Sequence, residues 1–418
     1  MSRVYKVKNF RTIQLARKIK NDIIKSITLA KIACILDDDK ILDEALGIAK
    51  GMDLLHYSEA LSKIAIEMAK AKRFDDALNM ANEVVEERFR LDALETIASY
   101  LCDVGKFDKA LEVAKNLKYR SQRALSNLSV NLAMAGDFEK SLQVAEMIRE
   151  KSWKAETLAK IGYVFYEANR PYEELFDKAL DVVRCINDKA IRSRTLLKIA
   201  IELAKTKKDY RTVLNEGLRI EKNDMDILNL ITGLVETNEI DTALRAVEFI
   251  KEKYWKVEAL LKIAHASSKK IERNMFENAI NVARSIKDKS TSSESLLKIA
   301  VEMANSGYKY DDIADIVEEA IENIKDVDDF LKSKVLTNAV IDFLKIGDIN
   351  KALEFSNNIV DDIYKSEVLF YVSSKLAKNK ELNEAMEIAN GISDDYWKSK
   401  ALSCIAVETI SPKDFEKL

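Results

Sequence analysis

A short apolar module recurs along the chain at intervals of about 33 residues. It reads LSKIAIEMAK at 61–70, LLKIAIELAK at 196–205, LLKIAHASSK at 260–269 and LLKIAVEMAN at 296–305. The residue after the isoleucine, here called the anchor, recurs at twelve positions, of which ten are small. The anchors are Ala33, Ala65, Ala98, Ser129, Gly162, Ala200, Ile231, Ala264, Ala300, Val340, Ser373 and Ala406. Self-similarity at this period is the sequence signature of a stacked repeat protein.

Each repeat predicts two helices, here called A and B. Around the anchor Ala65, the apolar residues Leu61, Ile64 and Met68 follow the i, i+3, i+4, i+7 spacing of one helix face, which defines helix A. After a short turn, helix B carries Ala-Leu-x-x-Ala, as at 77–81, and two small residues four apart share one helix face. The chain has only 10 glycines and 2 prolines in 418 residues, which strands and long loops would need. An all-α fold is therefore predicted.

The boundaries of helix A also repeat. Gly105, Gly136 and Gly347 follow helix A, where glycine commonly ends a helix, and Asp137 and Asp348 come next, where they can cap helix B. A bulky aromatic residue stands nine positions before several anchors, and we expect it to clamp helix A onto the preceding helix B; stacking on a ligand is the alternative. These aromatic residues are Phe89, Trp153, Trp255, Tyr364 and Trp397.

The two ends of the chain read as half repeats. Residues 9–24 match a helix B without its helix A, and residues 397–418 match a helix A followed by DFEKL (414–418), the start of another B. The whole chain, 1–418, is therefore predicted to be one continuous repeat domain of about eleven hairpins, or about 24 helices. Terminal repeats of such an array are normally capped by polar surfaces.

This pattern resembles the tetratricopeptide repeat superfamily, whose signature puts a Leu-small pair on the first helix and an alanine, then an aromatic residue, on the second. Here Ile64, Ala65 and Ala77 match, whereas Ala81 replaces the aromatic residue, and no proline follows helix B. HEAT-like or other α-solenoids stay open. The resemblance implies a right-handed superhelical α-solenoid with helices A on the concave side, where this superfamily typically binds peptides or partner proteins.

Composition and charge argue against several classes of function. The net charge is −3 and the pI about 5.9, whereas a general nucleic-acid binder is usually basic. The four cysteines lie at least 68 residues apart and only His56 and His265 are present, so neither a disulfide framework nor a zinc site is indicated. No Gly-rich phosphate loop or nucleophile motif occurs. We therefore expect a cytoplasmic, non-enzymatic protein with no catalytic residue, metal or cofactor.

Two rows of helix A are candidates for binding a protein or peptide partner. Two residues before the anchor, lysine recurs on the side of helix A opposite the core, where it could bind an acidic partner. The alternative is a solvated i, i+4 ion pair with glutamate, as between Lys198 and Glu202. One residue after the anchor, where a side chain should be half covered, apolar residues recur; tight packing of adjacent A helices is the alternative. The candidates are Lys63, Lys198, Lys262, Lys298, Ile66, Tyr163, Ile201, His265, Val301 and Ile341.

A second candidate surface comes from extra residues that we place in the A–B turns at 167–174, 205–211, 267–274 and 306–312. Insertions at one place in each repeat emerge on one edge of a solenoid. Basic residues interleaved with tyrosine would suit RNA or an acidic partner, and ordinary variable loops are the alternative. The edge candidates are Lys207, Lys208, Tyr210, Arg211, Lys269, Lys270, Tyr308 and Tyr310.

Overall fold

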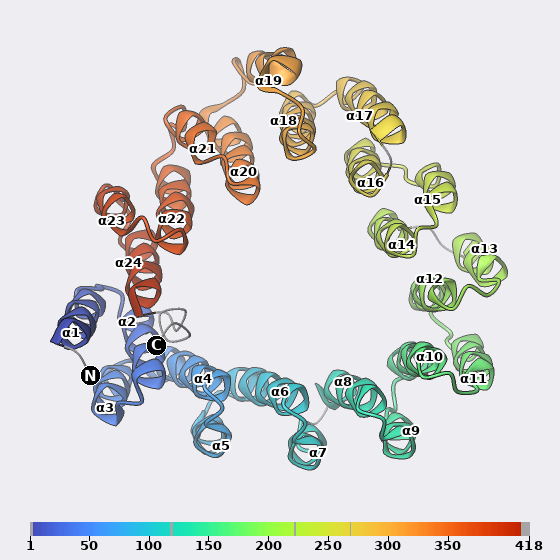
Figure 1. The fold of residues 1–418 in the computed structure, drawn as a ribbon, viewed down its shortest axis with the longest axis horizontal. Coiled ribbons are helices and arrows are strands. Elements are labelled where there is room, and N and C mark those ends of the chain that lie inside the picture. The colour runs from blue at the N-terminus through green and yellow to red at the C-terminus, as the bar shows by residue number, and fades with distance from the viewer. Residues whose placement is uncertain (1–2, 118–119, 221–222, 268, 411–418) are drawn as a thin grey trace. The chain divides into compact units, whose positions relative to one another are not determined.

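The computed structural model describes residues 3–117, 120–220, 223–267 and 269–410, and within these it contains 24 helices and no strand (Figure 1). The side chains of residues 3–8, 269–270 and 310–311 are not described, and DFEKL (414–418) lies outside the described residues. The helices are α1 (Arg3–Arg17), α2 (Asp22–Leu36), α3 (Asp39–Lys50), α4 (Leu54–Lys70), α5 (Phe74–Glu83), α6 (Glu87–Asp103), α7 (Phe107–Lys115), α8 (Ser121–Met134), α9 (Phe138–Glu146), α10 (Lys151–Glu167), α11 (Glu173–Arg184), α12 (Lys189–Lys205), α13 (Arg211–Ile220), α14 (Asp224–Glu236), α15 (Ile240–Val247), α16 (Lys253–His265), α17 (Lys269–Arg284), α18 (Lys289–Asn305), α19 (Tyr310–Asn323), α20 (Asp329–Ile346), α21 (Ile349–Ser356), α22 (Asp362–Lys378), α23 (Leu382–Asn390) and α24 (Asp395–Ile410).

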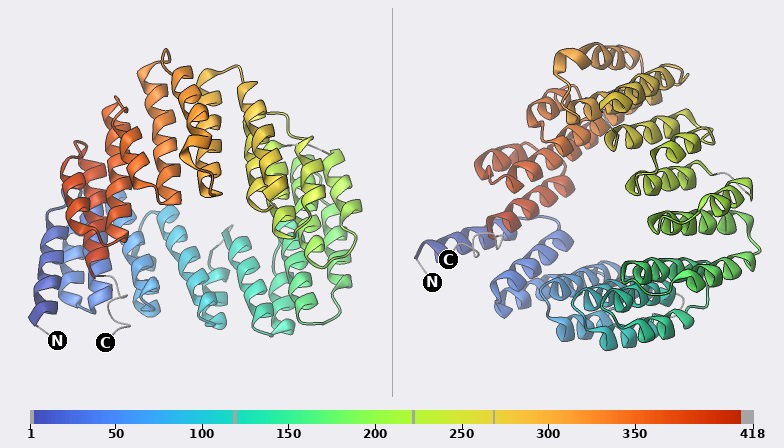
Figure 2. Two further views of the ribbon diagram at one scale, coloured as in Figure 1. Left: turned by 45° about the horizontal axis from the view of Figure 1, so that its top comes forward. Right: turned by 45° about the vertical axis from the view of Figure 1, so that its right-hand side comes forward.

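The helices alternate between the two predicted kinds. Every even-numbered helix contains one anchor and is an A helix. Each of them from α2 to α22 is followed by a B helix, so α2–α3 through α22–α23 form eleven hairpins (Figure 2). The first helix, α1, is a B helix and the last, α24, is an A helix. The predicted all-α fold of paired helices is confirmed.

Small residues at the anchors let each hairpin close tightly. All twelve anchors are buried, as are the paired small residues of helix B, such as Ala77 and Ala81. Gly162 shows how little room is left, because a Cβ atom there would lie 2.9 Å from the ring of Phe176 on α11. The repeated module is therefore a packing device between helix A and its own helix B.

The A–B turns share one backbone conformation. Gly105, Gly136 and Gly347 are left-handed, with φ of 76°, 86° and 88°, as the sequence predicts. Non-glycine residues adopt the same conformation at the equivalent places of other repeats, for example Lys72 with φ of 65°. The residue that follows donates its backbone N–H to a carbonyl five residues earlier, as in the bond from Asp137 to Leu132 (2.9 Å), which satisfies the open end of helix A. Asp137 and Asp348 cap helix B as predicted.

The extra residues of the longer repeats do not all lie in turns. Residues 269–274 belong to α17, which has 16 residues, whereas α15 and α21 have 8. The prediction of an inserted loop at 267–274 is therefore wrong for most of that segment: its charged residues alternate with apolar Ile271 and Met275 at helical spacing and extend helix B. At 168–172 and 206–210 the extra residues do form longer turns.

The described chain forms two compact units, residues 1–101 with 328–418, and residues 102–327. Within each unit, successive A helices pack on one another, as α2 on α4 and α10 on α12. Among the closely packed helix pairs of the described ranges, none consists of two successive B helices, although long side chains bridge some of them, such as Arg284 of α17 to Glu319 of α19 at 2.7 Å. Within each unit the stack therefore curves toward its A helices, and the B helices splay apart on the other side.

In the first unit, the two half repeats complete each other. Helix α24 packs against both α1 and α2. The hydroxyl of Ser399 accepts a hydrogen bond from the backbone N–H of Asn21 at 3.3 Å, and the Thr28 and Ser403 hydroxyls lie 2.7 Å apart. Lys20 also pairs with Asp395 at 3.0 Å. Instead of two separately capped ends, α24 and α1 form a hairpin from opposite ends of the chain.

The aromatic residues at the start of helix A pack between repeats. Phe89 is buried against Leu61 of α4 and Val84, which follows the preceding B helix. Trp397 lies beside Phe370 of α22, with their ring centroids 5.3 Å apart, and Lys400 is stacked over the Trp397 ring at 4.5 Å. Phe89 agrees with the predicted clamp onto the preceding helix B, whereas Trp397 contacts the preceding helix A, α22.

Candidate functional site

The residues after the anchors form a partly covered row on the A helices of the second unit. Val130, Tyr163 and Ile201 are half-buried and His265 is exposed, whereas Val301 is only 2% exposed. Ile201 owes its partial cover to Gly233 of α14, because a Cβ atom on that glycine would lie 2.7 Å from Ile201 Cγ2. The row is therefore open to a ligand over α8, α10, α12 and α16.

In the first unit the same row is less accessible. Ile66 is buried, at 9% exposed, while Ile341 is half-buried. The expectation of a half-covered row is wrong for Ile66 and Val301.

The lysines before the anchors do not make the expected pairs along their own helices. Lys198 binds Glu156 of the preceding A helix, α10, at 2.8 Å, and Lys298 binds Glu258 of α16. Glu202 pairs with Lys205 instead, at 3.0 Å. Both Glu156 and Glu258 are buried, so these pairs link neighbouring repeats across the A-helix face rather than stabilising one helix. The i, i+4 prediction for Lys198 with Glu202 and Lys298 with Glu302 is wrong.

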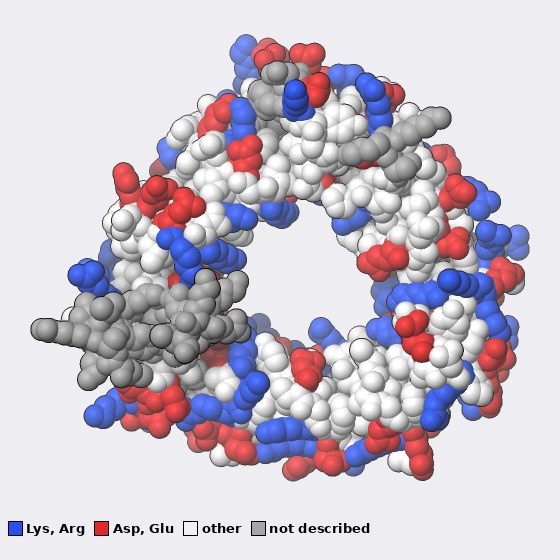
Figure 3. All heavy atoms as spheres, viewed as in Figure 1, with Lys and Arg blue, Asp and Glu red and all other residues white. Residues whose placement is uncertain are grey.

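Other lysines of this row project without a carboxylate partner in the described structure. Lys160 and Lys262 of the second unit and Lys63 of the first are exposed. Glu156 and Glu258 thus each bind a lysine from the following A helix, whereas Lys160 and Lys262, four residues after them on their own helices, have no carboxylate partner in the described ranges. Elsewhere, Lys and Arg are interspersed with Asp and Glu over the surface seen in Figure 3.

Two residues of the predicted basic edge, Lys208 and Tyr210, already have partners within the structure. Tyr210 is only 4% exposed, and its hydroxyl lies 2.6 Å from a Glu239 carboxylate oxygen and 2.9 Å from the Thr242 hydroxyl. Burial and the hydrogen bond to Glu239 raise its pKa. Lys208 binds Glu173 at 2.8 Å, and this bond holds the pKa of Glu173 at about 2. Tyr210 is therefore a structural residue and not an exposed stacking platform, which corrects that prediction.

The remaining edge residues fall into two groups. Lys207 and Arg211 are exposed, and Tyr308 is half-buried with its ring 5.7 Å from that of Phe276. The side chains of three further candidates are not described: Lys269, Lys270 and Tyr310.

One cluster joins the two predicted surfaces and was not foreseen. The rings of Tyr163 and Tyr166 are stacked at 6.4 Å, and Tyr172 contacts Tyr166 edge-on at 5.3 Å. Lys205 lies 5.3 Å from the Tyr163 ring, and Lys208 lies 5.1 Å from that of Tyr172. Burial raises the pKa of Tyr163. Sequence reasoning missed this cluster, because Lys205 and Lys208 come from the following repeat, more than 30 residues after the tyrosines.

The described residues offer little for metal or thiol chemistry. They contain no group of three or more His, Cys, Asp or Glu side chains placed to hold a metal ion. Burial raises the pKa of Cys34 to about 11 and that of Cys102 to about 12, so both thiols stay protonated at neutral pH. None of the helices in the described ranges is long and apolar enough to cross a membrane.

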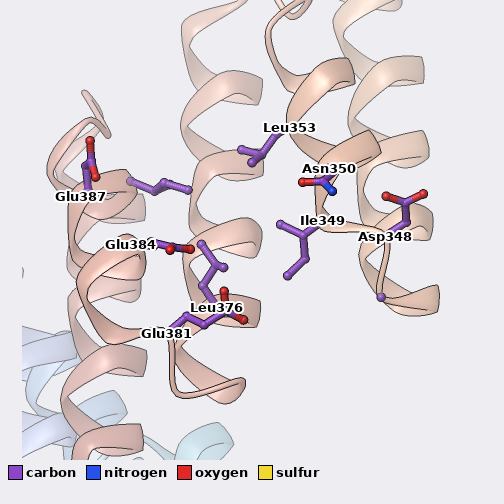
Figure 4. Close-up of a pocket in the computed structure, with 10 residues that line it drawn as sticks. Asp348, Ile349, Asn350, Leu353, Leu376, Glu381, Glu384 and Glu387 are labelled. Carbon is purple, nitrogen blue, oxygen red and sulfur yellow. The ribbon is translucent and has the colours of Figure 1, made fainter.

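The splayed B helices leave grooves between them. One, lined by residues of α15, α16 and α17, holds about 530 Å³ and includes Lys256 and Glu248. Another, between α17 and α19, holds about 390 Å³ and includes Arg273 and Glu277. A third, of about 460 Å³, lies between α21 and α23 over α22 and contains acidic but no basic side chains (Figure 4).

Comparisons with known proteins give no family. No family model and no curated protein matches the chain. Among solved structures, Ton1535 from Thermococcus onnurineus NA1 is 16% identical over 89% of this chain and 97% of its own, with a TM-score of 0.32. A structure described as a circular tandem repeat protein with novel repeat topology and enhanced subunit contact surfaces is 12% identical over 99% of this chain and 97% of its own, with a TM-score of 0.23.

Proposed function

We propose that this chain is a non-enzymatic scaffold that binds a protein or peptide on the A-helix face of its second unit, the side that tetratricopeptide-like proteins use. The row of partly open side chains after the anchors carries this proposal. Tyr163, Ile201 and His265 supply apolar and aromatic surface, and the exposed lysines Lys160 and Lys262 flank them. Such a surface suits a segment with apolar side chains between carboxylates.

The distribution of ion pairs favours a protein over RNA as the partner. A phosphate backbone is bound by several cations that are free to contact it. Here Lys198, Lys205, Lys208 and Lys298 each already bind a glutamate, and Tyr210 is buried. A peptide needs only a few such contacts beside its apolar ones, which the open row provides.

Charge reversal of exposed residues tests the proposal without disturbing the core. The variant Lys160→Glu with Lys262→Glu should lose partner proteins captured from the native host, because like charges would face the partner's carboxylates. The control, Lys115→Glu with Arg219→Glu, makes the same change of charge on exposed positions of the B helices α7 and α13 and should keep them. Nuclease treatment should leave capture intact. Equal capture by both variants, or capture that nuclease abolishes, would contradict the proposal.

A further inference from the structure

A groove on the opposite side of the hairpins, between α21 and α23, has a built apolar floor. Leu376 of α22 is buried at its base, and Ile349, Leu353 and Ile388 are half-buried around it (Figure 4). The groove lies where α21 and α23 are separated and a side chain of α22 forms the base between them. An apolar side chain of about leucine size would exclude water from this floor.

One wall of the groove is acidic. Glu381 lies just before α23, and Glu384 and Glu387 follow at i+3 and i+6 on the same helix face. The three side chains are exposed, and no Lys or Arg lines the groove, although each of the other two B-helix grooves contains a cation. The negative charge is therefore specific to this groove and not a property of its architecture.

The kind of partner follows from this combination. Nowhere in the described chain are three or more acidic groups placed to hold a metal ion, so an inorganic cation does not account for the wall. We propose that the groove binds a basic segment of a partner protein, in which Lys or Arg side chains flank a leucine-sized apolar side chain. The floor takes the apolar side chain, and the carboxylates of Glu384 and Glu387 take the cations. This surface is independent of the A-helix face.

Peptide binding to the full chain tests this directly. A fluorescein-labelled peptide Lys-Leu-Lys-Lys-Leu-Lys should bind, as measured by fluorescence anisotropy. Peptides in which glutamate replaces lysine or glycine replaces leucine should bind at least about tenfold more weakly, since a tenfold change corresponds to about 1.4 kcal/mol. Equal binding of the glycine peptide would overturn the role of the floor. Equal binding of the glutamate peptide would overturn the role of the wall.

Variants locate the site. Glu384→Lys with Glu387→Lys should weaken the leucine–lysine peptide about tenfold or more, and the neutral pair of Gln substitutions at both positions should weaken it less, if circular dichroism shows an unchanged fold. The control, Glu112→Lys with Glu216→Lys, reverses two exposed glutamates on α7 and α13 and should bind normally. An equal loss in the control would assign binding to net charge and overturn the proposal. Self-association of the chain that the groove variant abolishes would assign the groove to a second copy instead.

Discussion

The junction between the two ends of the chain can be tested against an internal contact of the same kind. The hydroxyls of Thr28 on α2 and Ser403 on α24 lie 2.7 Å apart, and so do those of Thr157 on α10 and Ser126 on α8. In both pairs the threonine is five residues before its anchor and the serine is three residues before its own. If α24 and α2 are neighbouring repeats, a double-mutant cycle should give a favourable coupling energy at both places.

The expected size of this coupling follows from burial. Thr28 and Thr157 are 1% and 0% exposed, so Thr→Val keeps the shape and removes only the hydroxyl. A net side-chain hydrogen bond contributes about 0.5–1.5 kcal/mol, and a buried hydroxyl left alone costs about 1–3 kcal/mol. Ser126 is 2% exposed whereas Ser403 is half-buried and can be reached by water. We therefore expect single-variant losses of about 1 kcal/mol at the terminal pair and about 2 kcal/mol at the internal pair.

Native-state hydrogen exchange measures these losses locally, which a global unfolding curve does not, because repeat arrays depart from two-state behaviour. Thr28→Val should speed exchange in the amides of 22–36 and 395–410 together, about fivefold for a loss of about 1 kcal/mol. Thr157→Val should do the same for 121–134 and 151–167. No coupling between Thr28 and Ser403, with clear coupling between Thr157 and Ser126, would refute the idea that the chain ends meet as ordinary repeats.

Three further predictions concern packing, backbone and thiol reactivity. Gly162→Ala should destabilise α10 and α11 by about 1–3 kcal/mol, measured by hydrogen exchange, because its Cβ atom would lie 2.9 Å from the Phe176 ring. Lys72→Gly should stabilise the chain by up to about 1 kcal/mol in thermal unfolding, since Lys72 has a left-handed φ of 65° that glycine adopts without strain. At mildly alkaline pH, iodoacetamide should modify the exposed Cys185 long before Cys102, whose pKa burial raises to about 12, and mass spectrometry of peptides would show a reversed order if Cys102 became accessible.

The fold could be predicted from the sequence because the residues that pack each hairpin lie within one repeat. The small anchors, the stripe around Ala65 and the glycines after helix A each depend on residues within one hairpin, and all three predictions are confirmed. Burial of Tyr210 could not be predicted, because its partners Glu239 and Thr242 belong to the next repeat and follow about 30 residues later. Local periodicity gives the faces of a helix but not the distance between neighbouring helices.

The ion pairs of the candidate site could not be predicted for the same reason, because they join neighbouring repeats. The lysine two residues before the anchor was placed correctly on the A-helix face, but its ion pair was assigned along the helix. Lys198 instead reaches Glu156, which is 42 residues earlier, because adjacent A helices pack closely enough for a lysine to span the gap. This spacing depends on how two hairpins pack on one another, so it becomes visible only when the helices are assembled.

A recurring serine on helix A forms a hydrogen bond to the next repeat, and the same hydrogen bond joins the two ends of the chain. Serine often stands seven residues before the anchor, and at Ser58, Ser333 and Ser366 its hydroxyl accepts the backbone N–H of the residue 28 positions later, just before the next helix A. Ser399 occupies this position in α24. Its hydroxyl accepts from the backbone N–H of Asn21, which caps α2 and stands twelve residues before the anchor Ala33, as each of the other three donors does before its own anchor. Helix α2 therefore takes the place of the next A helix for α24, and α1 packs on α24 as a helix B does.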